Sequence, residues 1–143
     1  MPKVSVIMPA YNAEKTVAQA INSVTGQTFG DFELIVIDDC SKDNTVCVIE
    51  DLAKNDERIV LLKNETNSGV AKTRNYGVSM AKGELIAFLD SDDMWRADKL
   101  EKQLGIFEKN TDAVISYTAS SFIDSEGNPY SYVMQAEEKT DYK

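Results

Sequence analysis

The chain has 143 residues, 43% of them hydrophobic, which is enough to fill one globular core. Its formal net charge of -9 gives no field that would draw it to nucleic acid or to an anionic bilayer surface. It contains no histidine, so imidazole ligands and histidine bases are excluded and carboxylates must carry any chemistry. No segment reaches the ~20 apolar residues of a membrane span, and Cys40 and Cys47 match no metal-site or secreted-framework spacing. We expect one soluble cytoplasmic domain over residues 1–143.

Strand-length apolar runs alternate with segments of helical period, which predicts βαβ units and a mostly parallel sheet flanked by helices. The first strand is expected at Val4–Met8. The helix after it has Asn12 as its N-cap and Gly26 as its stop. Asp43 is expected to cap the second helix, and Gly77 to let a third helix pack closely on the sheet. Further strands are expected at Glu33–Ile37, Arg58–Leu62 and Glu84–Leu89, and the third helix at Val70–Ala81.

The pattern changes in the last third of the chain. Leu100, Leu104 and Phe107 recur at helical intervals, and Ala113–Tyr117 is typical of another strand. The turn chemistry of Gly-Asn-Pro then predicts a hairpin between residues 120–124 and 130–134.

The first, second and fourth strands are expected to be parallel, so their carboxyl ends lie at one edge of the sheet. Open α/β sheets bind ligands at that edge. The segments leaving these ends are PAYN (9–12), DDCSKDN (38–44) and DSDD (90–93), which bring five or more carboxylates to one crevice. Opposite-end connections such as QTFGDF and MAKGE are far less acidic.

A crevice of carboxylates suits Mg²⁺ or Mn²⁺, which take oxygen ligands and fill their remaining positions with water and phosphate oxygens. Such a metal would stabilise Asp90, Asp92 and Asp93 and would hold a pyrophosphate that this acidic protein could not otherwise attract. The glycine-rich phosphate loops G-x-G-x-x-G after a strand and G-x-x-x-x-G-K-[ST] are missing. Asp38 or Asp39 could accept a hydrogen bond from a nucleobase N–H or a ribose hydroxyl.

The segments PAYN, DDCSKDNT, NSGVAKTRNYG and FLDSDDMW, in this order and at these intervals, resemble the N-terminal half of family 2 glycosyltransferases. These have the GT-A fold, and bacterial enzymes of surface-polysaccharide biosynthesis are the most similar. The resemblance implies transfer of a sugar from a nucleoside diphosphate donor, most often a UDP-sugar, with inversion at the anomeric carbon. The acceptor would be a hydroxyl of a saccharide or a lipid-linked saccharide.

The resemblance also assigns roles within a nucleotide-sugar site. The acid matching Asp39 recognises the base edge, and the D-x-D matching Asp90 and Asp92 contacts ribose and Mn²⁺ or Mg²⁺. Arg74 matches a basic position facing the nucleotide, where it would offset phosphate charge. The positions carried over are Pro9, Ala10, Tyr11, Asp39, Arg74, Asp90, Ser91 and Asp92, with Asp93 as a further metal contact.

Family members continue for roughly another half, which carries the catalytic base, typically an Asp, and nothing after Tyr117 matches it. We therefore expect a chain truncated before the acceptor half, in which donor binding survives and transfer is lost. The parent enzyme would lie in the cytoplasm or at the inner face of the membrane.

Two other functions stay open. One is a non-catalytic nucleotide-sugar binding module, and the other is a Mg²⁺-dependent phosphotransfer receiver. Two observations argue against the receiver. DSDDM lacks the Thr or Val expected after a phosphoaccepting D-x-D, and the Lys expected at a strand end of a receiver site is missing. Single residues also have structural explanations, since Tyr11 could pack a loop and Arg74 could form a surface ion pair.

Overall fold

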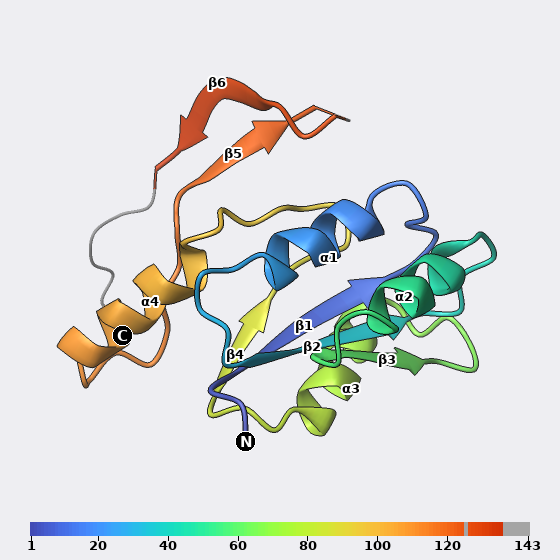
Figure 1. Cartoon of the computed structure of the whole chain (residues 1–143), viewed down its shortest axis with the longest axis horizontal. Helices are drawn as coiled ribbons and strands as arrows, with labels where there is room; N and C mark the ends of the chain where they lie inside the picture. The colour runs from blue at the N-terminus through green and yellow to red at the C-terminus, as the bar shows by residue number, and fades with distance from the viewer. Residues whose placement is uncertain (125, 136–143) are drawn as a thin grey trace. The chain divides into compact units, whose positions relative to one another are not determined.

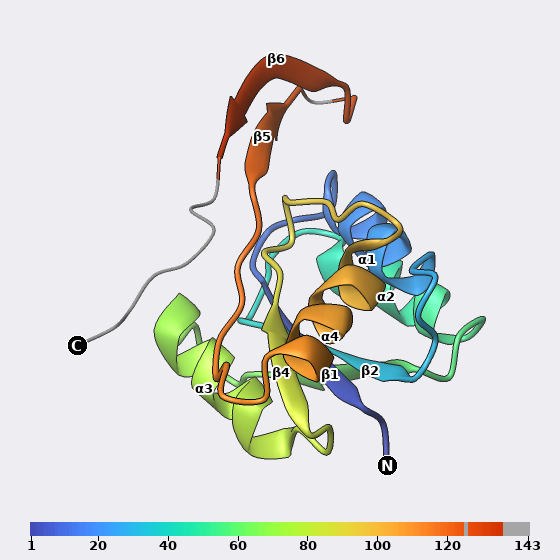
Figure 2. The ribbon, with the colours of Figure 1, turned by 90° about the vertical axis from the view of Figure 1, so that its left-hand side faces the viewer.

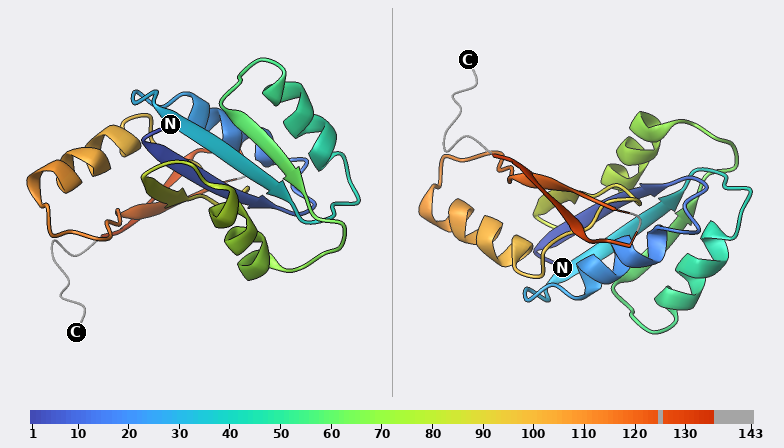
Figure 3. Two further views of the ribbon diagram at one scale, coloured as in Figure 1. Left: turned by 90° about the horizontal axis from the view of Figure 1, so that it is seen from below. Right: turned by 90° about the horizontal axis from the view of Figure 1, so that it is seen from above.

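The computed structural model describes residues 1–124 and 126–135, which form two compact units, Met1–Leu100 and a second that begins at Glu101. The first unit contains a four-stranded sheet in the order β3-β2-β1-β4, with every neighbouring pair parallel. Helices α1 and α2 cover one face of this sheet and α3 covers the other (Figures 1 and 3). Its elements are β1 (Val4–Ala10), α1 (Val17–Thr25), β2 (Phe32–Asp38), α2 (Thr45–Ala53), β3 (Ile59–Lys63), α3 (Val70–Met80) and β4 (Leu85–Phe88).

The central strands explain the continuous apolar runs in the sequence. Every residue of β1 and β2 is buried, because these two strands have neighbours on both edges and helices on both faces. The buried residues of α1 recur at helical spacing and form the stripe that packs inward; they are Val17, Ala20, Ile21 and Val24. The predicted α/β architecture with a mostly parallel sheet is confirmed.

The close approach of α3 to the sheet depends on Gly77, as predicted. A Cβ at this position would lie 2.6 Å from Cδ1 of Ile37 and 2.7 Å from Cγ2 of Ile7. We expect Gly77→Ala to lower the free energy of unfolding by about 1–3 kcal/mol through overpacking. Urea denaturation measures this loss. The matched control is Gly105→Ala in helix α4 (Lys99–Lys109), where nothing lies within 4 Å of the added carbon. An equal loss in both variants would show that close packing at Gly77 is not the cause.

Two predicted helix caps are wrong in detail. Helix α1 begins at Val17 with Thr16 as N-cap, and Asn12 instead adopts a left-handed backbone with φ 49° in the turn after β1. Asparagine tolerates this region, so the chain can turn sharply there. Asn44, not Asp43, is the N-cap residue of α2. Asp43 still supports that helix, because its Oδ1 accepts a hydrogen bond from the Thr45 N–H at 3.0 Å.

The helix predicted around Leu100, Leu104 and Phe107 is confirmed as α4. The predicted hairpin is also confirmed, as antiparallel strands β5 (Ser120–Ile123) and β6 (Pro129–Met134). The strand predicted at Ala113–Tyr117 is wrong, since this segment has no regular structure and Val114 is 95% exposed. Strand propensity is realised only where a neighbouring strand provides a ladder, and within the described residues none pairs with this segment.

None of the helices formed by the described residues has the length and apolar character that crossing a bilayer requires.

Candidate functional site

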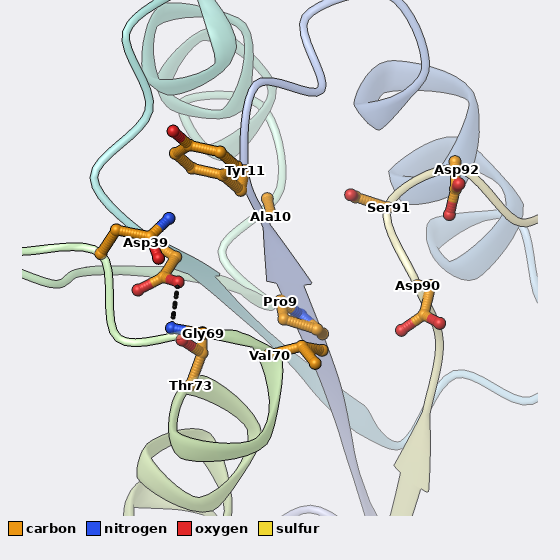
Figure 4. Close-up of a pocket in the computed structure, with 11 residues that line it drawn as sticks. Pro9, Ala10, Tyr11, Asp39, Gly69, Val70, Thr73, Asp90, Ser91 and Asp92 are labelled. Carbon is orange, nitrogen blue, oxygen red and sulfur yellow. Dashed lines mark hydrogen bonds between the residues drawn. The ribbon is translucent and has the colours of Figure 1, made fainter.

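A pocket lies at the edge of the sheet where β1, β2 and β4 end, the edge at which the sequence predicts a ligand site. Its volume is about 420 Å³. Figure 4 shows Asp39 on one side and Asp90, Ser91 and Asp92 on the other. The lining residues are Pro9, Ala10, Tyr11, Asp39, Asn67, Gly69, Val70, Thr73, Asp90, Ser91 and Asp92. Topology therefore brings together the predicted nucleotide-contact positions, apart from Arg74.

Asp39, which directly follows β2, organises one wall of the pocket. It is only 4% exposed, and its Oδ1 accepts hydrogen bonds from Asn64 Nδ2 at 2.7 Å and from the Ser68 N–H at 2.8 Å. Its Oδ2 accepts the Gly69 N–H at 2.9 Å. Burial acts to raise the pKa of Asp39, but these hydrogen bonds outweigh it and hold the pKa below the ordinary value. The carboxylate therefore stays ionised and fixes the start of α3.

The segment between β3 and α3 contributes lining residues that sequence reasoning missed. Gly69 has φ 80°, a left-handed conformation that glycine adopts without strain, and it is the N-cap residue of α3. Asn64 also donates to Oγ1 of buried Thr73 at 3.1 Å, which joins the helix to the same network. The Asn-Ser-Gly sequence indicated a loop but not these contacts. Asn67, Val70 and Thr73 complete this wall.

The turns after β1 and β2 are locked to each other. The Asn12 N–H donates to Ser41 Oγ at 2.9 Å, and the Lys42 N–H donates to Asn12 Oδ1 at 2.8 Å. These bonds hold the chain just after Tyr11, and just before it the Asp39 N–H donates to the Ala10 carbonyl at 2.8 Å. Tyr11 itself is 50% exposed and lines the pocket. Tyr11 therefore presents a ring surface on which a planar ligand could stack.

The remaining acids of the second turn have structural roles. Asp43 accepts the Glu14 N–H through Oδ2 at 3.1 Å. Burial acts to raise its pKa, but hydrogen bonds from Thr45 and Glu14 hold the pKa below the ordinary value. Asp38 is 3% exposed, and its Oδ2 accepts the Ser41 N–H at 3.1 Å. Neither residue is among the lining residues of the described pocket, so the crevice holds fewer carboxylates than its loops contain.

The acidic segment after β4 is stabilised in part by a cation from the protein. Arg74 on α3 forms an ion pair with Asp90, and the two side chains are 35% and 44% exposed. Asp93 is not among the described lining residues. Burial and the charges of Asp92 and Asp90 raise the pKa of Asp93 above its ordinary value. Arg74 is therefore placed against the first carboxylate of the D-x-D motif, while Asp93 is repelled by the charges of Asp92 and Asp90.

The acidic side chains of the pocket can hold a hard divalent cation only if a bound substrate supplies some of the coordinating oxygens. Among the described residues, no group of three or more acidic or cysteine side chains is arranged to hold a metal ion. Mg²⁺ is usually held by one or two carboxylates together with substrate phosphates, rather than by an all-protein cage. Asp90 and Asp92, on the lining of one pocket, match that smaller requirement. The metal ligands Asp90, Asp92 and Asp93 stay predictions.

The fold and the pocket together define an α/β protein whose candidate ligand site lies at the carboxyl edge of a parallel sheet. The family model of glycosyl transferase family 2 matches residues 5–142. The chain belongs to this family, which removes the phosphotransfer receiver as an alternative.

Two of the curated relatives, both from bacteria, illustrate the similarity. TuaG of Bacillus subtilis, a glycosyltransferase assigned to teichuronic acid biosynthesis, is 41% identical over 141 residues, which are 99% of this chain and 56% of the relative. The Escherichia coli enzyme WfgD is a UDP-Glc:alpha-D-GlcNAc-diphosphoundecaprenol beta-1,3-glucosyltransferase. It is 50% identical over 107 residues, which are 75% of this chain and 42% of WfgD. The chain thus spans about half the length of these relatives.

A solved structure supports the fold. The crystal structure of Staphylococcus aureus TarS 1-349 in complex with UDP-GlcNAc aligns with a TM-score of 0.71 and 32% identity. The alignment covers 85% of this chain and 40% of that structure. The predicted GT-A fold is therefore confirmed.

Proposed function

We propose that this chain is the donor-binding part of an inverting glycosyltransferase that uses a UDP-sugar together with Mn²⁺ or Mg²⁺. The observation that carries the proposal is the meeting of Asp39 with Asp90 and Asp92 at one pocket, although they leave different strands. The pocket volume of about 420 Å³ falls within the usual range for small-molecule sites. The activity of WfgD supports a UDP-sugar donor and a lipid-linked acceptor.

Each wall of the pocket has a chemistry that suits one part of a nucleoside diphosphate. Asp39 is ionised and would accept a hydrogen bond from a base N–H, while Pro9, Ala10 and Tyr11 would lie along the base and ribose. Asp90 and Ser91 offer acceptors for ribose hydroxyls. Asp92, assisted by Asp90 and Asp93, would hold the divalent cation, which when bound stabilises charge on the departing diphosphate.

Transfer by the complete enzyme would be a direct displacement in which a carboxylate deprotonates the acceptor hydroxyl as it attacks. We place that carboxylate outside the matched region, because nothing after Tyr117 resembles a base motif. This chain would then bind the donor without transferring the sugar. Its biological role would be in polysaccharide biosynthesis at the cytoplasmic side of the membrane.

Calorimetric titration with UDP, GDP, CDP and dTDP, each with and without Mn²⁺, tests the proposal. We expect UDP to bind most tightly, with Mn²⁺ strengthening binding by about tenfold or more, because Asp90 and Asp92 would hold a cation that offsets the charge of the diphosphate. Asp92→Asn keeps the side-chain shape but removes the charge, so the gain from Mn²⁺ should fall to about twofold or less.

The matched control for this titration is Asp112→Asn, an exposed acid in the second unit that should leave both affinity and metal dependence unchanged. UDP binding that is indifferent to Mn²⁺ and to Asp92→Asn would refute the metal assignment. Absence of nucleotide binding by the unmodified chain would refute the proposed function.

A further inference from the structure

The segment that carries the acidic residues, Leu89–Leu100, leaves β4 and passes beside α1 (Figures 1 and 2). Its first end is fixed in the sheet, since the Leu89 N–H donates to the Ile7 carbonyl at 3.2 Å. Within it, the Asp93 N–H donates to the Asp90 carbonyl at 3.1 Å and forms a tight turn. The geometry of Asp90 and Asp92 therefore depends on what holds the other end.

Gln27, just after α1, holds that other end. Its Nε2 donates to the Arg96 carbonyl at 2.7 Å and to the Ser23 carbonyl at 2.9 Å, and its Oε1 accepts the Leu100 N–H at 3.0 Å. The side chain is only 7% exposed. Both donor hydrogens and the acceptor of the amide are thus used inside the protein, where leaving any of them unpaired is costly.

Two neighbouring contacts extend this anchor. Ser23 Oγ accepts the Trp95 N–H at 3.1 Å, and the Thr28 N–H donates to the Ala97 carbonyl at 2.9 Å. Positions 95, 96, 97 and 100 are therefore all bonded to the end of α1 or to the turn after it. Only a few residues lie between Asp92 and the first of these anchors, so little slack remains in the turn.

We infer that Gln27, assisted by Ser23, is a positioning residue that sets the acidic turn for nucleotide and metal binding. It touches neither ligand and acts through the backbone of residues 95–100. A neutral amide suits this role, because it donates to a carbonyl and accepts from an N–H at once without adding another charge near a segment that already carries Asp90, Asp92 and Asp93. The effect on ligand binding rests on the proposed function, whereas the effect on the turn does not.

Amide hydrogen exchange, followed by mass spectrometry on the whole chain well below its unfolding midpoint, tests the inference without any ligand. Gln27→Met keeps the size of the side chain and removes its hydrogen bonds. We expect exchange in a peptide covering residues 90–100 to accelerate by about tenfold or more, because buried backbone groups lose their partners. Peptides covering β1 and β2 should keep their exchange rates.

Two further variants keep the test decisive. Ser23→Ala removes the Trp95 contact and improves helix propensity, so it should fold and loosen the same peptide by a smaller factor. Gln19→Met makes the same chemical change at an exposed position of α1 and should alter nothing. Uniform acceleration across the strands, or no change at residues 90–100, would overturn the inference.

The effect on ligand binding is tested by titrating the same variants with UDP in the presence of Mn²⁺. Affinity should fall about tenfold in Gln27→Met and remain unchanged in Gln19→Met. A loosened turn with unchanged UDP affinity would overturn the positioning role. If the unmodified chain does not bind UDP, the proposed function fails, while faster exchange confined to residues 90–100 still supports the anchoring of the turn by Gln27.

Discussion

Asp39→Asn is expected to weaken UDP binding by about 100-fold and to lower the free energy of unfolding by about 2–4 kcal/mol, because hydrogen bonds to a charged acceptor are among the stronger ones. Asp39 accepts bonds from Asn64, Ser68 and Gly69. An asparagine offers one acceptor oxygen and turns an NH₂ group toward a donor. The start of α3 should loosen, and the wall formed by Gly69 and Thr73 with it.

The loss of unfolding free energy in Asp39→Asn is expected to become smaller as the pH falls. The folded pKa of Asp39 lies below its ordinary value of 3.8, so its stabilising contribution is fully present above that value and is lost as the pH falls through the folded pKa. The difference in unfolding free energy between the unmodified chain and Asp39→Asn should be constant from about pH 5 to 8 and shrink below pH 3.8. Urea denaturation over this range measures it. Asp51→Asn, at an exposed ion pair, is the control and should cost about 1 kcal/mol or less.

If Asp39→Asn unfolded like the unmodified chain, the hydrogen bonds of Asp39 would not organise the start of α3. If it lost stability but bound UDP normally, Asp39 would support the fold without recognising the base. These two outcomes separate the structural role of Asp39 from its proposed role in binding.

The sheet and the location of the site could be predicted from the sequence because both follow from backbone rules. Buried parallel strands produce continuous apolar runs, and short crossovers place the ends of β1, β2 and β4 at one edge. Tyr11 and Asp39 directly follow strands and Asp90 lies just beyond the end of β4, so the topology alone brings them to one pocket. Their placement required no knowledge of side-chain direction.

What could not be predicted depends on contacts between side chains distant in sequence. Arg74 is paired with Asp90, and Gln27 is bonded to Arg96 and Leu100, and no periodicity or motif marks either arrangement. Gln27 lies in the connection QTFGDF, whose composition gives no sign of a role at the acidic edge of the sheet. An uncharged side chain that holds a site in place therefore cannot be recognised from the pattern of charged residues in that site.

Arg74→Glu should have the second large effect, a loss of about 100-fold in UDP affinity measured in the presence of Mn²⁺. The substitution replaces the cation paired with Asp90 by an anion, next to a pocket that already contains Asp39 and Asp92. At an effective dielectric of about 20, two unit charges about 4 Å apart interact by roughly 4 kcal/mol. A 100-fold loss of UDP affinity corresponds to about 2.7 kcal/mol, so part of the repulsion between the new carboxylate and the diphosphate is sufficient to cause it.

Lys72→Glu separates this local effect from net charge. Lys72 lies on the same helix, is exposed, and gives the same change of two charge units when reversed. Because solvent and salt screen an exposed charge, its effect on UDP affinity should stay below about threefold and vanish at high ionic strength. Equal losses in the two variants would mean that overall charge, rather than the Arg74–Asp90 pair, governs binding.

Stability gives an independent check on the same pair. Both side chains are more than one third exposed, so breaking the pair should cost about 1 kcal/mol or less of unfolding free energy. Arg74→Glu should therefore remain folded while losing its ligand, a separation that circular dichroism and calorimetry on one sample would reveal. A collapse of the fold would instead assign Arg74 to the scaffold, and its proposed role beside the diphosphate would then lack support.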